Sequence, residues 1–342
     1  MTDKKSEKCR IAVDAMGGDY APKHEILGAV AALRDDNNFE LILVGDKKKI
    51  LQIAAEENIS LAENVILHTS QVISMNDKPA EALKSKKDSS LVVGAGLVRD
   101  KKADAFVSAG NTGAVAAAST LLIGRLKNIE RPTIGSFIPS ESNATYLFDV
   151  GAFVDVKPQH LFEYAVLASI FVKELHGISN PTVALLNVGE EDEKGNRQVK
   201  ETAELLRISD LNFIGNVEGR DILKGKANVV ICDGFVGNII LKFGESVPHF
   251  MKYLLKQHSE TNLLEKIKIG LFKNTLKKAL SPLNPDLYGG VPLLGINGIT
   301  IIGHGSSSPL AIKNMILRAK EMYDKNLLQK FEEALKTYAI QK

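Results

Sequence analysis

The chain has 342 residues, of which 44% are hydrophobic and 25% are charged, and its 43 basic and 41 acidic residues give a net charge of +2. This composition is typical of a globular protein with a buried core, so it excludes the disordered, collagen-like and fibrous classes. The near-zero net charge also excludes a uniformly basic surface, and no nucleic-acid partner is expected.

Cysteine usage and the N-terminus indicate where the protein works. Cys9 and Cys232 are the only cysteines, and their spacing fits neither a disulfide framework nor a metal site, which predicts a cytoplasmic protein without a bound metal. Residues 1–8 are polar with charges of both signs, so they predict a flexible tail and not a secretory signal. Because no window contains the roughly 18 to 20 consecutive apolar residues of a spanning helix, any membrane contact is expected to be peripheral.

Short runs rich in isoleucine, valine and leucine alternate with longer helical patterns, which indicates a large, mostly parallel α/β sheet. Strands are expected at residues 10–15, 40–44, 64–67, 105–108, 133–138, 145–150, 182–187, 212–215, 229–232 and 298–303. Helices are expected at residues 23–34, 47–57, 79–85, 89–99, 112–126, 159–174, 198–206, 309–323 and 325–339. Because no linker or repeat divides the chain, residues 9–342 are predicted to form a single α/β domain with a lysine-rich helical excursion at 244–283.

Six of the expected strands end in a glycine-rich turn, near residues 17, 110, 151, 189, 234 and 305. In an open α/β sheet such turns share the carboxyl edge, where ligands bind. Glycine lets backbone N–H groups approach an anion closely, and a helix that starts there adds its partial positive charge. Any one of these turns taken alone is better explained as a simple tight connection. Because six such turns carry Asp, Asn, His and Ser, we expect a polar-ligand site, with the turns at 111–112 and 305–306 facing one crevice.

Nucleotide and nucleophile motifs are mostly absent. The segment 94–99 begins like a dinucleotide fingerprint but continues as helix interior, and neither a phosphate-binding loop with Gly-Lys-Ser/Thr nor a Gly-x-Ser-x-Gly elbow occurs. Cys232 is predicted to be a buried structural thiol and not an acyl-carrying nucleophile, because no basic neighbour in sequence would activate it.

Two further residues have the chemistry of a catalytic site. His304 stands between two glycines at a strand end, where imidazole either binds phosphate, protonates a leaving thiolate or simply packs. Lys194 lies among four acidic residues and close to Asn196. It either supplies positive charge to the crevice or belongs to a solvated acidic loop.

Taken together, six ordered motifs resemble the PlsX family, the bacterial phosphate acyltransferases of phospholipid synthesis, from about residue 11 to residue 316. The motifs are Ala-Met-Gly-Gly-Asp at 15–19, Ser-Ala-Gly-Asn-Thr-Gly-Ala at 108–114, Leu-Leu-Asn-Val-Gly-Glu-Glu at 185–191, Gly-Asn-Val-Glu-Gly-Arg-Asp at 215–221, Cys-Asp-Gly-Phe-Val-Gly-Asn at 232–238, and Gly-Gly-Val-Pro-Leu-Leu-Gly-Ile-Asn-Gly with His-Gly-Ser-Ser at 289–298 and 304–307. One departure is Phe153, which follows Asp-Val-Gly-Ala where the family usually has asparagine.

The resemblance implies an α/β/α sandwich with a large, mostly parallel sheet, like that of isopropylmalate dehydrogenase and phosphotransacetylase, with a protruding helical arm. It implies a homodimer that moves a long-chain acyl group from acyl-carrier protein to inorganic phosphate, without a cofactor. The acyl phosphate would pass to a membrane glycerol-3-phosphate acyltransferase. Phosphate is itself the nucleophile in this reaction, so the protein has to hold a dianion against a thioester carbonyl and stabilise the oxyanion that forms.

On this resemblance, the catalytic residues are expected to be Lys194 and Asn238, which polarise the carbonyl or the phosphate, and His304, the general acid for the departing thiolate. Asp19 and Asp149 would orient these donors. The substrate-binding set is Gly17, Gly18, Asp19, Asn111, Thr112, Gly113, Asp149, Asn196, Gly305, Ser306 and Ser307.

The lysine-rich stretch has helical spacing of apolar residues with lysines between them. A basic amphipathic helix of this kind rests in the interface of an anionic membrane, and the family resemblance favours that interpretation. The alternatives are that the stripe packs on the core or on a dimer partner, or that it docks the carrier protein, for which lysines 86–87 and 101–102 compete. The proposed membrane-contacting residues are Leu264, Ile267, Leu271, Phe272, Lys273 and Lys277.

Three other functions remain to be weighed. A phosphotransacetylase that uses acyl-coenzyme A is closest in chemistry. A nicotinamide-dependent decarboxylating dehydrogenase would use the same type of fold, but the sequence lacks its aspartate cluster and arginine set. A peripheral membrane scaffold would leave the polar glycine turns without a purpose.

Overall fold

The computed structural model describes residues 8–340, so residues 1–7 of the predicted tail lie outside the described residues. Within this part of the chain the strands form one eleven-stranded sheet with the order β3-β2-β1-β4-β11-β10-β5-β6-β9-β7-β8. The strands are β1 (Cys9–Asp14), β2 (Phe39–Gly45), β3 (Ile66–His68), β4 (Ala105–Ser108), β5 (Thr133–Ser140), β6 (Asn143–Phe148), β7 (Val183–Leu186), β8 (Phe213–Val217), β9 (Val229–Ile231), β10 (Val291–Leu294) and β11 (Ile299–Ile302).

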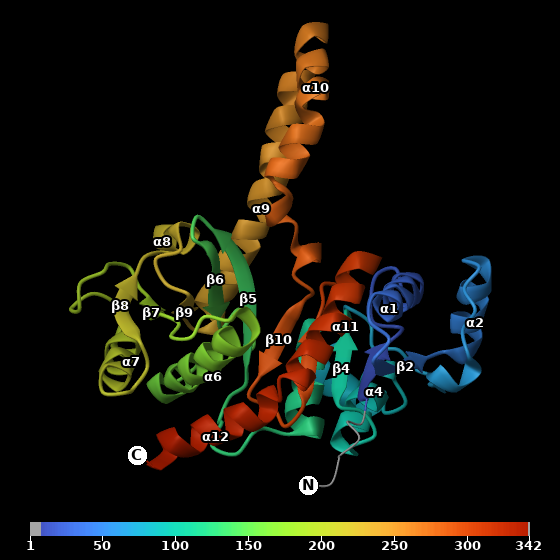
Figure 1. Cartoon of the computed structure of the whole chain (residues 1–342), viewed down its shortest axis with the longest axis horizontal. Helices are drawn as coiled ribbons and strands as arrows, with labels where there is room; N and C mark the ends of the chain where they lie inside the picture. The colour runs from blue at the N-terminus through green and yellow to red at the C-terminus, as the bar shows by residue number, and fades with distance from the viewer. Residues whose placement is uncertain (1–7, 341–342) are drawn as a thin grey trace.

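Helices cover both faces of the sheet, which confirms the predicted α/β/α sandwich (Figure 1). Strand β1 shows why: Ile11 and Val13 join one apolar core, whereas Ala12 between them joins the other. A strand buried on both faces is apolar throughout. The helices of the body are α1 (Lys23–Asp35), α2 (Lys47–Glu56), α3 (Pro79–Ser85), α4 (Ser90–Arg99), α5 (Thr112–Ala118), α6 (Pro158–His176), α7 (Arg197–Arg207), α8 (Gly219–Lys224), α11 (Pro309–Asp324) and α12 (Leu327–Ile340).

The sheet is mixed at its centre, and this changes where the glycine turns lie. Three successive antiparallel pairings, β11 with β10, β10 with β5 and β5 with β6, reverse the strand direction across the middle of the sheet. Strands β6, β9, β7 and β8 are parallel to one another. Because three antiparallel pairings separate them from β11, they run antiparallel to β1, β4 and β11. The expectation that all six turns share one carboxyl edge is therefore wrong, and the turns fall into two groups.

The other differences from the predicted elements are local. The sequence analysis missed β10, because four residues that include Pro292 lie between glycines with positive φ and give no strand period. It also missed the short helix α8. The predicted helix at 112–126 is too long, since α5 passes into a single π-helical turn, Ser119–Ile123, that stops at Gly124 with φ +91°.

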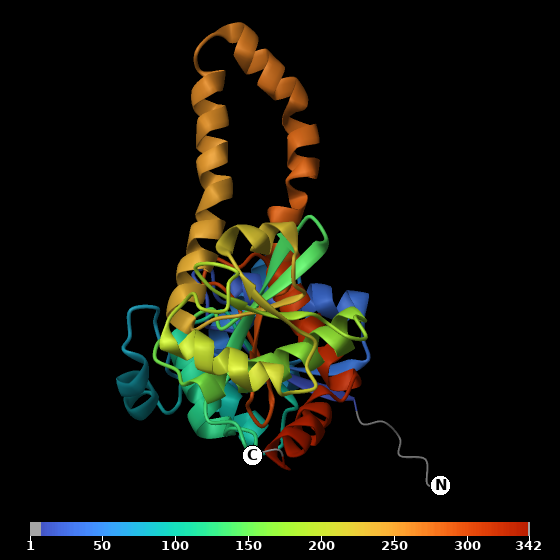
Figure 2. The same cartoon turned by 90° about the vertical axis from the view of Figure 1, so that its left-hand side faces the viewer.

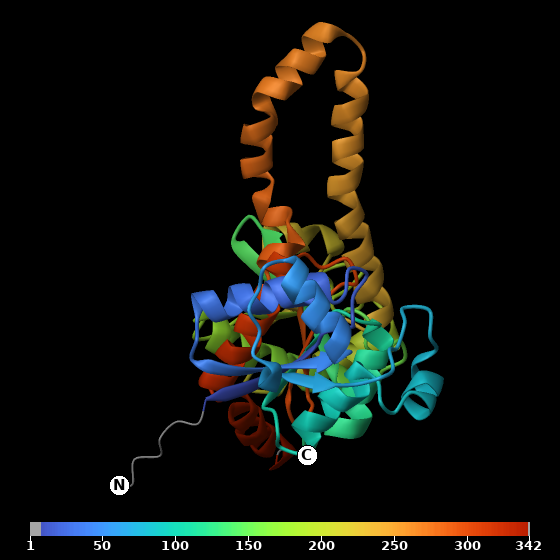
Figure 3. The ribbon, with the colours of Figure 1, turned by 90° about the vertical axis from the view of Figure 1, so that its right-hand side faces the viewer.

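The predicted helical excursion is a hairpin of two helices, α9 (Gly234–Ser259) and α10 (Leu263–Ala279). It projects from the body as an arm and begins earlier than residue 244, directly after β9 (Figures 2 and 3). No residue of α10 is buried, so its apolar stripe does not pack on the core of this chain. Among the helices of residues 8–340, none is long and apolar enough to span a bilayer.

Candidate active site

The first group of turns follows β1, β4 and β11, three adjacent parallel strands. These turns touch one another directly. The N–H of Asp19 donates a hydrogen bond to the carbonyl of Gly305 over 2.8 Å. A β carbon added at Gly18 would lie 3.5 Å from the Gly305 oxygen, and one added at Gly110 would lie 3.4 Å from the α carbon of Gly17. Glycine is needed at positions 17 and 18 because β carbons there would overlap Asp14 Oδ2 and Glu25 Oε1.

A buried polar pair supports this contact from below. The Ser108 hydroxyl donates to Asp14 Oδ2 over 2.7 Å and accepts from the Gly110 N–H over 3.1 Å, while the Met16 N–H donates to Asp14 Oδ1 over 3.2 Å. Burial raises the pKa of the Asp14 carboxyl above its ordinary value. A β carbon on Gly17 would overlap this carboxyl, so the turn is built around the pair.

Hydrogen bonds inside the turns reduce the number of backbone amides that are available to bind phosphate. The Ser306 N–H donates to His304 Nδ1 over 3.3 Å and the Ser307 N–H to the His304 carbonyl over 2.9 Å, so both amides are already used. Among the other amides of these turns, those of Gly18, Thr112, Gly113 and Gly305 have no acceptor within the part of the chain that the structure describes. These four N–H groups are available to an anion.

His304 is exposed, and its ring is held by the loop it lies on. Its Nδ1 lies 2.8 Å from the Ser306 hydroxyl and accepts the Ser306 N–H. In the neutral imidazole this arrangement places the hydrogen on Nε2. His304 therefore has one nitrogen free to donate to a substrate.

The second group of turns follows β6, β9 and β7, and Asp149 organises it. Its buried carboxylate accepts N–H groups from Ile134 (3.1 Å), Gly151 (3.3 Å), Ala152 (3.1 Å) and Phe153 (2.9 Å). Burial raises its pKa to about 6, although these hydrogen bonds act in the opposite direction. Phe153 thus contributes its backbone N–H, and its ring lies under the Arg131 guanidinium at 4.7 Å.

Asn238 lies near the start of α9, which follows β9, and packs against this turn. It is half-buried, and a β carbon added at Gly151 would lie 3.4 Å from its Oδ1. The Asn238 side chain therefore lies against the backbone of the turn that Asp149 holds. Cys232 is buried beside it, and burial raises the pKa of the thiol well above its ordinary value, which favours an inert structural thiol.

Lys194 is exposed on the loop after β7. The loop is ordered through its backbone, with the Lys194 N–H bonded to the Glu191 carbonyl and the Asn187 amide bonded to the Lys194 carbonyl, both at 3.1 Å. The Lys194 ammonium forms no ion pair with any described residue, although acids surround it in sequence. The Asn196 side chain caps α7 by accepting the Val199 N–H over 2.9 Å, so only its amide group is free.

The structure thus brings together Gly17, Gly18, Asp19 and Gly305 to Ser307 in one group, and Asp149 with Asn238 in another. Lys194 and Asn196 lie after β7, the strand parallel to β9. Between residues 8 and 340, no hydrogen bond or ion pair joins the two groups. A substrate that meets both has to bridge the two halves of the sheet. An open depression of about 550 Å³ between α6 and α7 contains none of these residues.

Sequence reasoning missed Glu25, which lies beneath the first group on α1. It is buried, its Oε2 has no hydrogen-bond partner, and its Oε1 lies against Gly18. Burial raises its pKa to about 8, and the nearby Asp14 and Asp19 carboxylates act in the same direction. The sequence does contain a sign of this burial, because Glu25 is an acidic residue on the apolar face of the expected helix at 23–34.

Comparison with known proteins agrees with this architecture. A family model described as "Fatty acid synthesis protein" matches residues 9–330. A phosphate acyltransferase of Chlorobaculum parvum is 46% identical and the match covers 95% of this chain and 98% of the relative. One of Halothermothrix orenii is also 46% identical, over 93% of this chain and 96% of the relative.

Solved structures share the fold. A phosphotransacetylase from Streptococcus pyogenes matches with a TM-score of 0.62 at 16% identity, over 93% of this chain and 95% of that one. A branched-chain phosphotransacylase from Enterococcus faecalis matches with a TM-score of 0.55 at 14% identity, over 92% and 99%. These matches confirm the expected phosphotransacetylase-like fold.

The fold and the sequence relatives together define an α/β acyltransferase. The chain belongs to the fatty acid synthesis protein family, and it is a phosphate acyltransferase. The PlsX resemblance is therefore confirmed, and the dehydrogenase and scaffold alternatives are not supported.

Replacing Glu25 with glutamine should change how stability depends on pH. A carboxyl whose pKa is about 8 in the folded state and about 4.5 when unfolded binds its proton more tightly in the folded state, so stability falls as pH rises between these values. We expect Glu25→Gln to match the native protein near pH 4.5 and to be more stable by at least about 1.4 kcal/mol near pH 8.5, since one pKa unit corresponds to that free energy.

Urea unfolding at both pH values measures this difference, with the exposed Glu40→Gln as the control that should leave the native pH dependence unchanged. Equal pH dependence in Glu25→Gln and the native protein would contradict the buried state of this carboxyl.

Proposed function

We propose that this enzyme transfers a long-chain fatty acyl group from acyl-carrier protein to inorganic phosphate, releasing free carrier protein and acyl phosphate for phospholipid synthesis. The observation that carries the proposal is the set of unused backbone N–H groups of Gly18, Thr112, Gly113 and Gly305 at contacting glycine turns, in a chain of an acyltransferase family. The acyl phosphate is expected to pass to a membrane glycerol-3-phosphate acyltransferase.

The four amides are proposed to hold phosphate while one of its oxygens attacks the thioester carbonyl carbon. A carbon–oxygen bond forms, and the carbon–sulfur bond breaks in the tetrahedral intermediate. The proton of monohydrogen phosphate ends on the carrier thiol, so no oxidant, metal or cofactor is required. Holding the two reactants together supplies much of the rate enhancement.

Three side chains are proposed to act on the reacting groups. Lys194 and Asn238, whose polar ends have no partner within residues 8–340, stabilise the negative charge on the carbonyl or phosphate oxygen. His304 accepts the proton of monohydrogen phosphate and passes a proton to the departing thiolate, so the imidazole is neutral before and after the transfer. Asp149 holds the turn that contacts Asn238, and Asp19 helps to hold the Gly305 turn.

The acyl donor is the finer part of this proposal. Exposed Lys87, Lys101 and Lys102 form no ion pair with any residue of the described chain, whereas Lys86 is paired with Asp77. The first three are proposed to dock an acidic carrier protein. An acyl-coenzyme A donor is the alternative.

Incubation of the purified protein with phosphate and either palmitoyl-carrier protein or palmitoyl-coenzyme A tests the donor. We expect acyl phosphate, trapped as hydroxamate, to form faster with the carrier protein. Faster formation with coenzyme A would assign the donor to the alternative, and no acyl phosphate with either would refute the proposed reaction.

Truncation of Lys194 should slow turnover. Removing one donor to a developing oxyanion costs on the order of 100-fold in kcat, so Lys194→Ala is expected to show that loss without a change in thermal unfolding. The exposed Lys200→Ala on α7 is the control for loss of a nearby positive charge. Native turnover by Lys194→Ala would remove this lysine from the mechanism.

The arm is proposed to place this cytoplasmic enzyme on an anionic membrane. The segment from residue 252 to residue 278 contains seven lysines and only two glutamates. In α10, Leu264, Ile267, Leu271 and Phe272 are exposed next to Lys273 and Lys277. A basic helix with an exposed apolar stripe binds the interface of anionic lipids.

Leu271→Glu should weaken binding to anionic vesicles several-fold, because Leu271 is 77% exposed at the centre of the stripe. Ile208→Glu, an equally exposed apolar residue on the body, is the matched control and should bind as the native chain does. Flotation with vesicles containing phosphatidylglycerol measures both. Equal flotation of Leu271→Glu and the native chain would place the stripe away from the membrane.

The protein is further proposed to be a homodimer. Helix α9 exposes a second apolar stripe at helical spacing, Phe235, Ile239, Phe243, Val247, Phe250 and Leu254. A stripe of this length that the described residues leave exposed supports association with the same stripe of a second copy.

A further inference from the structure

The segment between β3 and α4, residues 70–89, forms an arch that projects from the body (Figures 2 and 3). The two ends of the arch are tied together. The Ser70 N–H donates to Asp88 Oδ2 over 2.8 Å, the Asp88 N–H to Gln71 Oε1 over 3.0 Å, and the Ser90 N–H to the Gln71 carbonyl over 3.3 Å. These hydrogen bonds fix the base from which the arch extends.

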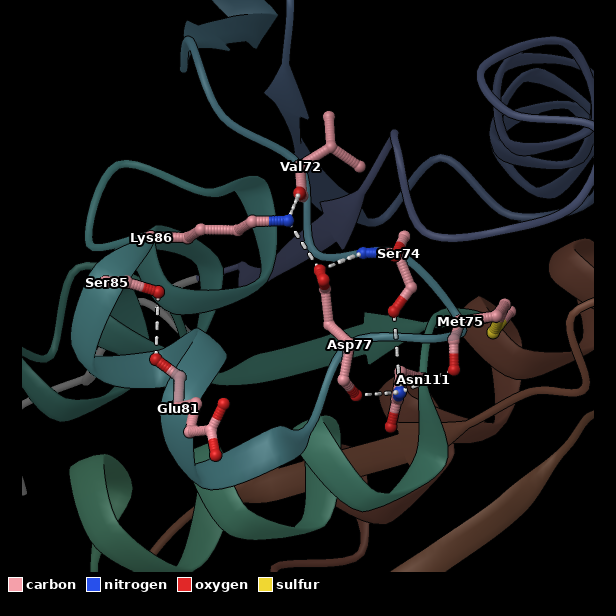
Figure 4. A network of polar contacts seen from close by, with 8 residues as sticks. All are labelled: Val72, Ser74, Met75, Asp77, Glu81, Ser85, Lys86 and Asn111. Carbon is pink, nitrogen blue, oxygen red and sulfur yellow. Dashed lines mark hydrogen bonds and ion pairs between the residues drawn. The ribbon is translucent and has the colours of Figure 1, made fainter.

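The middle of the arch is also fixed by polar contacts. The Lys86 ammonium donates to the Val72 carbonyl over 2.9 Å and to Asp77 Oδ2 over 2.5 Å, and the same oxygen accepts the Ser74 N–H over 2.8 Å. Figure 4 shows Lys86 reaching across the arch to both groups. A surface segment with this many internal hydrogen bonds holds a defined shape.

Asn111 attaches the arch to the first group of glycine turns. Its Nδ2 donates to the carbonyls of Met75 (2.9 Å), Asp77 (3.1 Å) and Ser74 (3.4 Å), while its Oδ1 caps α5 by accepting the Ala114 N–H over 3.0 Å. Figure 4 shows these carbonyls converging on the one amide. The Asn111 side chain is thereby fully used in positioning the arch, so only the backbone after it is available to phosphate.

The attachment places Met75 next to the proposed phosphate site. Its methyl group lies so close to Gly305 that a β carbon there would be 2.5 Å away, yet 40% of the residue is exposed. In Figure 4 the Met75 side chain points away from Asn111, toward the C-terminal segment. An apolar surface thus borders a free amide of the cradle.

An apolar side chain does not bind phosphate, but it can contact the alkyl chain of the second substrate, the acyl thioester. The thioester carbonyl has to lie next to phosphate during attack, so the first carbons of the acyl chain lie there too. Methionine is unbranched and polarisable, and it adapts to alkyl chains. The three carbonyls around Met75 already accept hydrogen bonds from Asn111, so this part of the arch offers an apolar contact more readily than a polar one.

We propose that Met75, held against Gly305 by the Asn111 side chain, is a specificity-determining residue that contacts the acyl chain of the donor. Asn111 is then a positioning residue that acts through Met75. The inference rests on the proposed acyl transfer to phosphate.

The test compares kcat/KM for palmitoyl and butyryl donors in the native protein and in variants. A contact of one or two methylenes corresponds to about 10-fold, so Met75→Gln should lower the palmitoyl-to-butyryl ratio about 10-fold with the KM for phosphate unchanged. Met75→Leu, which keeps an apolar side chain at this position, should retain the native palmitoyl-to-butyryl ratio. Met251→Gln, at a methionine exposed to a similar degree on α9, should leave it unchanged.

The Asn111→Asp variant tests the positioning role, because aspartate still caps the helix but cannot donate to the arch. It should reproduce the selectivity loss, and the double variant with Met75→Gln should be no worse than either alone. Asn262→Asp, at a cap without a second role among the described contacts, is the control.

Several results would overturn the inference. An equal loss for both donors, an unchanged ratio in Met75→Gln, or additive losses in the double variant would each do so while leaving the proposed function intact. If the native protein forms no acyl phosphate from any donor, the proposed function is refuted, and the inference that rests on it is refuted as well.

Discussion

The hydrogen bond between Ser108 and Asp14 supports the part of the molecule on which the proposed phosphate site depends. It joins the ends of two neighbouring strands beneath Gly17 and Gly110, and a β carbon on Gly17 would overlap the Asp14 carboxyl. With the glycine turns in contact, four backbone N–H groups are left without acceptors at one place. An anion is the natural partner of such groups, because unsatisfied donors cost free energy and an oxyanion accepts several of them.

Because the strand direction reverses across the sheet, the polar residues of the candidate site fall into two separate groups. Backbone amides gather after β1, β4 and β11, whereas Lys194 and Asn238 belong to strands of opposite direction. The two substrates of an acyl transfer to phosphate suit this division, since one group can hold the anion while the other meets the carbonyl. The Asn111 side chain extends the first group, because it brings the arch and Met75 up to Gly305.

The arm is separate from this chemistry in structure. Its second helix has no buried residue, so none of its apolar stripe contributes to the core of the chain that the structure describes. An exposed apolar stripe of this kind costs solubility unless a membrane or a second copy covers it. The body and the arm can therefore be altered independently, which makes their variants informative.

The sequence by itself determined the family, the α/β/α architecture, most strand positions and the amphipathic character of α10, because motifs and hydrophobic periods are local. It also placed Asn111, Asp149 and Asn196 among the polar residues of the turns. Only the tertiary structure decided what these side chains do: Asn111 holds an arch whose Met75 is 36 residues away, Asp149 folds its own turn, and Asn196 caps a helix. The reversed sheet direction and the burial of Glu25 were likewise decided by strands and helices that meet from distant parts of the chain, and no local pattern records such pairings.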